Sequence, residues 1–148
     1  MKPGAETGRT GRAITRELAL KTAQPVELVD ITGEVERVVA ASGISSGICY
    51  LTVPHTTAGI LINENDDPEV ARDIEAALDR LAPSGAAYRH REGNADAHIK
   101  SAVVGASQVV FIENGRLALG RWQGIFFGEF DGPRQRRVRL KLVADPGE

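Results

Sequence analysis

The 148-residue sequence has little cysteine, few aromatic side chains and almost no net charge. Its single Cys excludes a disulfide within the chain, and nothing suggests a secreted fold held together by disulfides. Eighteen Lys and Arg against 20 Asp and Glu leave a formal charge of −2, whereas a dedicated nucleic-acid binder normally carries a basic excess. No apolar run approaches the roughly 18–20 residues that cross a membrane, and the N-terminal residues lack the apolar core of a secretory signal. We therefore expect a cytoplasmic protein that binds neither nucleic acid nor membrane.

The length of the chain fits one domain, because a domain of roughly 150 residues can bury about two-thirds of the surface that its unfolded chain exposes. Hydrophobic residues make up 42% of the sequence, an ordinary share for a folded globular protein. Residues 1–12 are polar, with three Gly and one Pro, and are predicted to be a flexible N-terminal tail. The sequence contains no later linker and no internal repeat, so residues 13–148 are predicted to form a single domain.

Hydrophobic periodicity and turn residues predict the strands and helices of this domain. The predicted strands span residues 13–21, 48–53, 58–62, 107–112, 116–120, 122–130 and a last segment in which Val138, Leu140 and Leu142 alternate with Arg137, Arg139 and Lys141. The predicted helices follow the cap residues Thr32, Asp67 and Asn94, and they end at Gly43, Pro83 and Gly105. The third helix is predicted to bury Ile99, Ala102 and Val103, and Asn114-Gly115 is a strong hairpin signal. Strands at both ends with helices in the middle predict an α+β fold with a largely antiparallel sheet.

Each of the three His residues lies in a loop or at the edge of a predicted element. His55 falls between two strands, His90 lies in the loop after Tyr88, and His98 falls in the first turn of the third helix. They are either unrelated surface residues or a cluster formed by folding, which would ligate a metal or bind a phosphate. The chain has no HExxH and no CxxC motif, so the local signal for a metal is weak.

Two polar segments lie next to predicted helix starts. The segment 63–68 holds Asn63, Asn65 and Asp66 before the cap residue Asp67, and it is either a solvated corner or a set of oxygen ligands and hydrogen-bonding groups. Asn94 and Asp96 have a structural explanation as a cap and as a partner of the helix dipole. A positively charged His98 is disfavoured there, so a neutral imidazole acting as a ligand or an acid–base group fits better.

The last third of the chain adds candidate binding groups. Trp122 is either a core residue or a pocket wall. Glu129 lies within an apolar strand and needs a partner if it is buried, which Arg134 or a metal could supply. The alternating basic residues of the last strand are best explained as a solvated face, so Arg134 is the predicted anion contact. Cys49, among apolar neighbours, is predicted to be an inert core thiol.

Several motifs together resemble one known family. They are Pro54-His55-Thr56-Thr57-Ala58, Asn63-Glu64-Asn65-Asp66-Asp67-Pro68, Tyr88-Arg89-His90, Ala97-His98-Ile99-Lys100, Gly115-Arg116, and Trp122-Gln123-Gly124-Ile125 with Glu129. In order and spacing they are similar to the YjbQ-like family, also called the secondary thiamine-phosphate synthase family, over roughly residues 13–143. The resemblance implies a small α+β protein with a half-barrel-like sandwich and two or three helices, assembled as a homotrimer.

The resemblance also implies an activity, the joining of a hydroxymethylpyrimidine diphosphate to a thiazole phosphate with release of pyrophosphate. From residue types, we expect catalytic roles for His55, His98, Asp66 and Glu129, and substrate contacts from Thr56, Asn63, Asn65, Asn94, Trp122 and Arg134. A divalent metal, Zn or Mg, would be held by His55, His90 and His98. Two alternatives remain open: a trimer that binds a metal or a phosphorylated metabolite without catalysis, and a purely structural trimer with His at its edges.

Overall fold

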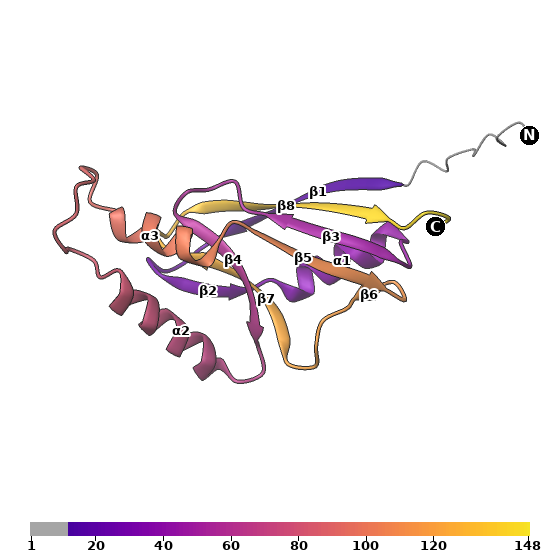
Figure 1. The fold of residues 1–148 in the computed structure, drawn as a ribbon, viewed down its shortest axis with the longest axis horizontal. Helices are drawn as coiled ribbons and strands as arrows, with labels where there is room; N and C mark the ends of the chain where they lie inside the picture. Colours follow the sequence, from indigo (N-terminus) through magenta and orange to yellow (C-terminus); the bar gives the residue numbers. More distant parts are fainter. Residues whose placement is uncertain (1–11) are drawn as a thin grey trace, which may run out of the picture.

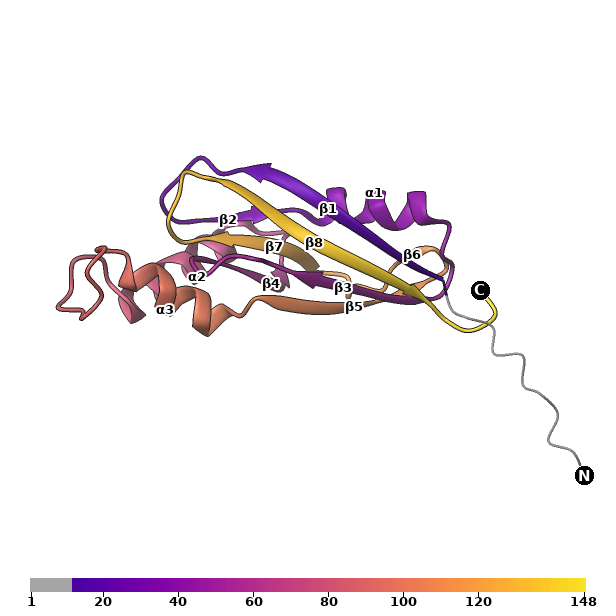
Figure 2. The ribbon, with the colours of Figure 1, turned by 90° about the horizontal axis from the view of Figure 1, so that it is seen from above.

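Two antiparallel sheets carry the fold of residues 12–148, the part of the chain that the computed structural model describes. The larger sheet has the strand order β1-β8-β3-β5-β6 and the smaller one has the order β2-β7-β4. The strands are β1 (Ala13–Lys21), β2 (Glu27–Asp30), β3 (Gly47–Thr52), β4 (Ala58–Glu64), β5 (Ser107–Glu113), β6 (Arg116–Leu117), β7 (Gln123–Glu129) and β8 (Gln135–Ala144). The sheets curl into a half-barrel, and the predicted α+β class is confirmed (Figures 1 and 2). Nearly all of the predicted tail lies outside the described residues.

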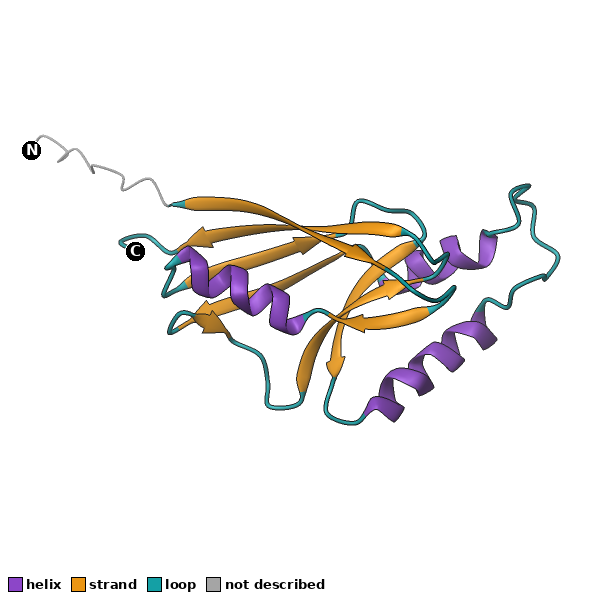
Figure 3. Cartoon of the chain, turned by 180° about the vertical axis from the view of Figure 1, so that it is seen from behind, coloured by secondary structure: helices purple, strands orange, loops and turns teal. Residues whose placement is uncertain are grey.

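Three helices accompany the sheets: α1 (Thr32–Ser42), α2 (Pro68–Leu81) and α3 (Ala95–Val104). Helix α1 lies at one end of the molecule, whereas α2 and α3 lie at the other, as Figure 3 shows from behind. The core is formed by apolar side chains of α1 and of both sheets, among them Val35, Val39, Leu51, Ile60, Phe127 and Leu140. None of the three helices is long and apolar enough to span a lipid bilayer.

The helix boundaries match the sequence prediction, but two of the three predicted caps do not. Asp67 accepts a hydrogen bond from the Glu69 amide at 2.9 Å, as predicted. Thr32 is the first residue of α1 rather than its cap, and its hydroxyl contacts Asp30 and the Ile125 amide. Asn94 makes no side-chain cap to α3.

The largest correction concerns the face that α3 buries. The predicted stripe of Ile99, Ala102 and Val103 is exposed, and Ala97, Lys100 and Ser101 face the protein instead. Ser101 donates to the Ala58 carbonyl at 2.6 Å, which ties this face to strand β4. The more apolar side of the helix therefore lies on the surface of the single chain.

Some strands are longer or shorter than predicted, because pairing with a neighbouring strand sets where they end. Strand β4 continues through Asn63 and Glu64 because these residues pair with Gly124 and Gln123 of β7. Strand β6 is only two residues long, and the short strand β2 was not predicted. The predicted Asn114-Gly115 hairpin is confirmed, because both residues have positive φ, 52° and 75°.

Candidate functional site

Three loops that are far apart in the sequence meet at the end of the molecule where β1, β3 and β7 finish. A fully buried carboxylate joins two of them directly: Glu129 accepts hydrogen bonds from the Thr22 hydroxyl at 2.8 Å and from the Asp131 amide at 2.9 Å. Its main partner is Arg136, whose Nε and Nη2 atoms donate to the two carboxylate oxygens at 2.8 and 2.6 Å. Glu129 and Arg136 therefore form a buried, bidentate ion pair at this end of the molecule.

The partner predicted for Glu129 was therefore wrong, since Arg136 and not Arg134 or a metal holds it. The predicted catalytic role of Glu129 is also corrected. Its side chain is 0% exposed and both oxygens already accept two hydrogen bonds each, so a substrate has no access to it. Burial alone would raise the pKa of Glu129, but the hydrogen bonds from Arg136, the Asp131 amide and Thr22 lower it below its ordinary value.

Arg136 is not among the predicted site residues, although the alternation of buried and exposed residues in the last strand places it on the buried side. Val138, Leu140 and Leu142 point into the core, and Arg136 lies on the same side of the alternation. Arg137, Arg139 and Lys141 are exposed as predicted. An arginine at an inward position of a strand needs a buried partner, and Glu129 is that partner.

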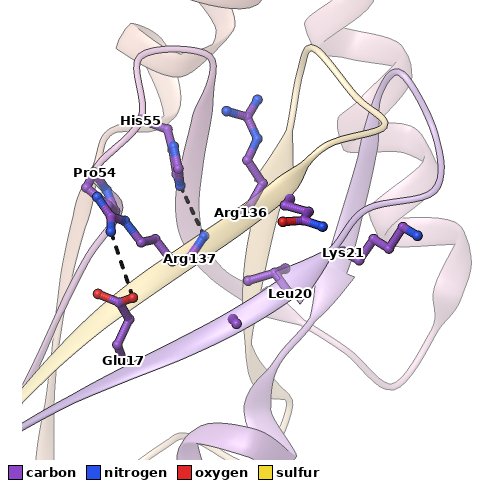
Figure 4. Close-up of a pocket in the computed structure, with 9 residues that line it drawn as sticks. Glu17, Leu20, Lys21, Pro54, His55, Arg136 and Arg137 are labelled. Carbon is purple, nitrogen blue, oxygen red and sulfur yellow. Dashed lines mark hydrogen bonds and ion pairs between the residues drawn. The ribbon is translucent and has the colours of Figure 1, made fainter.

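A hollow of about 720 Å³ lies beside this pair (Figure 4). It is lined by Glu17, Ala19, Leu20, Lys21, Pro54, His55, Gln135, Arg136 and Arg137. The Nε2 atom of His55 accepts a hydrogen bond from the Arg137 amide at 3.1 Å, and the Arg137 guanidinium is 3.9 Å from the Glu17 carboxylate. The lining of the hollow therefore combines the imidazole with three cationic side chains and one carboxylate.

The surroundings of His55 favour its neutral form. Burial and the positive charges of Arg136 and Arg137 lower the pKa of His55 below its ordinary value of 6.5. Protonation of Nε2 would also break the hydrogen bond from the Arg137 amide. At neutral pH, the hollow thus holds an uncharged imidazole among fixed positive charges, an arrangement suited to binding an anion.

The other two His residues contact each other. The rings of His90 and His98 are 5.1 Å apart between centroids in an edge-on arrangement, and His90 Nε2 is 3.8 Å from Glu92. Among residues 12–148, no group of three or more His, Cys, Asp or Glu side chains could hold a metal ion. A three-His metal site within one chain is therefore wrong, because folding pairs His90 with His98 and leaves His55 beside β8.

The polar segment before α2 lines a different hollow, of about 310 Å³. Asn65 donates to Asp30 at 3.1 Å and lines this hollow, whereas Asn63 and Asp66 are exposed and do not line it. Thr56 is exposed in the loop next to His55. The structure therefore does not bring the residues of this segment together with His55.

Asn94 lies at a third hollow, of about 470 Å³, and donates to Asp131 at 3.0 Å. Arg134, the predicted anion contact, instead donates hydrogen bonds to the backbone carbonyl and to the carboxylate of Asp131. Lys100, which the sequence analysis missed, is 1% exposed and lies 2.7 Å from Asp79. No local pattern pointed to it, because the buried side of α3, which also carries Ala97 and Ser101, is not the more apolar side of the helix.

Trp122 is not a core residue. It is 49% exposed, and the Arg121 guanidinium lies 4.8 Å from its ring centroid. Cys49 is confirmed as a buried core thiol, and burial raises its pKa to about 12.

Comparisons with known proteins agree with this fold. The model of the family described as "UPF0047 protein YjbQ-like" matches residues 16–145. The chain is 51% identical over 129 residues to the UPF0047 protein YugU of Bacillus subtilis, covering 86% of this chain and 98% of that protein. A crystal structure of an uncharacterised protein of the YjbQ/UPF0047 family from Clostridium acetobutylicum is 52% identical, with a TM-score of 0.84, and covers 86% of this chain and 99% of the other. A YbjQ-like protein of unknown function from Sulfolobus solfataricus gives a TM-score of 0.88 at 34% identity, covering 92% and 100% of the two chains. The chain therefore belongs to the YjbQ-like UPF0047 family.

Proposed function

We propose that this protein is a transferase with thiamine-phosphate synthase activity, and that the hollow beside β8 binds a phosphorylated substrate. The observation that carries the proposal is that Lys21, Arg136 and Arg137 line one hollow together with a neutral His55. Opposite charges attract an anionic ligand into such a hollow, and the hollow's volume of about 720 Å³ is in the range of small-molecule sites.

The proposed reaction asks mainly for stabilisation of a leaving diphosphate. Fixed positive charges and N–H donors aimed at the departing oxygens lower the barrier because they interact most strongly with the charge that develops there. Lys21 and Arg137 would supply charge, and the neutral His55 would donate its remaining N–H. The described residues of one chain do not fit a resident Zn or Mg ion, so no step here depends on one.

We also propose that the protein works as a homotrimer. The exposed stripe on α3, formed by Ile99, Ala102 and Val103, supports this assembly. Val109, Phe111 and Tyr50 add exposed apolar surface on adjacent strands β5 and β3. Contiguous apolar side chains on a soluble chain typically mark an interface with another protein surface.

One observation favours the alternative, in which the protein binds a phosphorylated metabolite without catalysis. The buried carboxylate of Glu129 is sealed from the hollow, and the carboxylate that lines it, Glu17, is engaged with Arg137. His55 is then the one uncharged acid–base group among the lining residues. A site rich in charge and poor in proton-transfer groups suits binding as well as leaving-group stabilisation.

Turnover of the two thiamine precursors separates the two functions. We expect product formation with wild type, measured with and without added Mg²⁺ or Zn²⁺. His55→Ala should lower kcat/KM by about 100-fold or more if the imidazole acts in the transition state. Arg139→Ala is the matched control, because this residue is exposed on the same strand and does not line the hollow. Equal rates in folded wild type and His55→Ala would contradict the enzymatic proposal, and stoichiometric binding without turnover would favour the alternative.

A further inference from the structure

Neighbouring residues of strand β8 hold the loop before β4 at two points. The backbone amide of Arg137 donates to His55 Nε2 at 3.1 Å. The side chain of Arg136 donates to the Thr57 carbonyl at 3.2 Å and to the Thr57 hydroxyl at 2.8 Å. Both ends of the short segment from His55 to Thr57 are therefore attached to consecutive positions of one strand.

The arginine that holds Thr57 cannot easily move. Its side chain is 5% exposed, and two of its N–H groups are fixed by the fully buried Glu129. If Arg136 turned away, Glu129 would keep a buried charge with no cationic partner, which is strongly unfavourable. The geometry of Thr57, and with it the loop that carries His55, is thus determined by a buried ion pair.

The bond from Arg137 decides where the imidazole carries its proton. A backbone N–H can only donate, so Nε2 of His55 must be free of hydrogen to accept from it. The proton of the neutral ring then lies on Nδ1. In this state neither nitrogen is available to a metal ion: one is occupied as an acceptor and the other bears a proton. The ring is available as a hydrogen-bond donor through Nδ1.

The positively charged groups around the ring also favour the neutral form of His55. Arg136 and Arg137 disfavour a positive imidazolium, and Lys21 lines the same hollow. Glu129 opposes them from its buried position, and Glu17 is paired with Arg137. The surroundings therefore keep His55 uncharged, and the hydrogen bond fixes its tautomer.

We propose that the buried Arg136–Glu129 pair is a positioning device, which together with the Arg137 amide holds His55 as a neutral donor with its proton on Nδ1. Arg136 and Glu129 act through the loop and do not themselves need to touch a ligand. Only the nature of the ligand, an oxyanion that accepts from Nδ1, rests on the proposed function.

The test observes the imidazole directly, by NMR of protein labelled with ¹⁵N in histidine. His90→Gln and His98→Gln variants assign the signals of the other two His residues. In wild type above pH 7 we expect one tautomer at His55, with the proton on Nδ1 and a titration midpoint below 6.5. In Glu129→Gln/Arg136→Gln, which removes both charges, we expect a mixture of tautomers and a higher midpoint. Arg139→Gln is the matched control and should leave both readouts unchanged.

A milder variant keeps the test valid if the double variant does not fold. Thr57→Val removes only the hydroxyl that Arg136 contacts, and a partial loss of the single tautomer is expected. A proton on Nε2 in wild type would overturn the proposal, as would an unchanged tautomer in folded variants. Addition of inorganic pyrophosphate tests the ligand separately: a shift of the His55 Nδ1 proton supports the proposed function, and no shift counts against that function while the positioning role stands.

Discussion

At the residue scale, the buried charge of Glu129 makes the protein sensitive to substitution of Arg136. We expect Arg136→Met to lower the free energy of unfolding by about 3–5 kcal/mol, because it leaves a buried carboxylate without its partner. Arg139→Met, on the exposed side of the same strand, should change it by less than about 0.5 kcal/mol. Urea unfolding followed by circular dichroism measures both. Equal losses in the two variants would show that Glu129 does not depend on Arg136.

The thiol of Cys49 gives a second test of the core at the same scale. It is fully buried on β3, and its pKa is raised to about 12, so almost no reactive thiolate exists at neutral pH. We expect no reaction of the native protein with a thiol reagent at pH 8 and one equivalent after unfolding in urea. Rapid stoichiometric labelling of the native protein would mean that β3 opens readily or is less protected than the structure indicates.

At the element scale, the starts of α2 and α3 look alike in sequence but differ in structure. Asp67 caps α2 through the Glu69 amide, whereas the Asn94 side chain contacts Asp131. Asp67→Ala should therefore lower the free energy of unfolding by about 1 kcal/mol, which chemical denaturation can measure. Asp66→Ala alters the adjacent exposed carboxylate and should have almost no effect. A loss as large in Asp66→Ala would indicate that local charge, and not the cap, stabilises the helix.

The boundaries of the helices could be predicted because the signals that begin and end them are local. Asp67 and Gly43 act on backbone groups within one turn, and the chain around them contains the whole signal. The buried face of α3 could not be predicted in this way. Its more apolar stripe lies outward, so the rule that apolar residues face the core of their own chain gave the wrong answer.

The site could be predicted only in part for a related reason. The motif around His55 was found, but its partners come from residues about 80 positions away in the sequence, at Arg136 and Arg137. Alternation in β8 placed Arg136 inward, yet its partners there, Glu129 and Thr57, belong to strand β7 of the other sheet and to the loop before β4. Periodicity predicts which side of a strand is buried, and tertiary pairing decides which polar groups meet.

At the scale of the whole molecule, the outward stripe of α3 is an argument for assembly. Val103 is 57% exposed and Phe111 is 58% exposed, and removing such side chains from water stabilises an association. We expect Val103→Asp/Phe111→Asp to shift the protein from trimer to monomer in sedimentation velocity. Arg37→Asp on α1 also introduces a carboxylate at an exposed position, but outside the apolar surface, and should leave the assembly unchanged. A wild type that sediments as a monomer would contradict the proposed trimer.

Titration of two site residues, His55 and Glu129, makes the free energy of unfolding of the whole molecule depend on pH. The pKa of His55 is about 6.5 in the unfolded chain and lower in the folded chain. Between these two pKa values the unfolded chain binds more protons, so the free energy of unfolding falls as the pH falls. Glu129 has a lowered pKa too, so its contribution is present above about 4.5 and is lost as the pH falls through its folded value. In His55→Gln, we expect a smaller loss of unfolding free energy than in wild type as the pH falls from 7 through 6.5 and below. Urea midpoints measured from pH 7 downward test both windows, and identical curves for the two proteins would show that His55 titrates alike in the folded and unfolded chains.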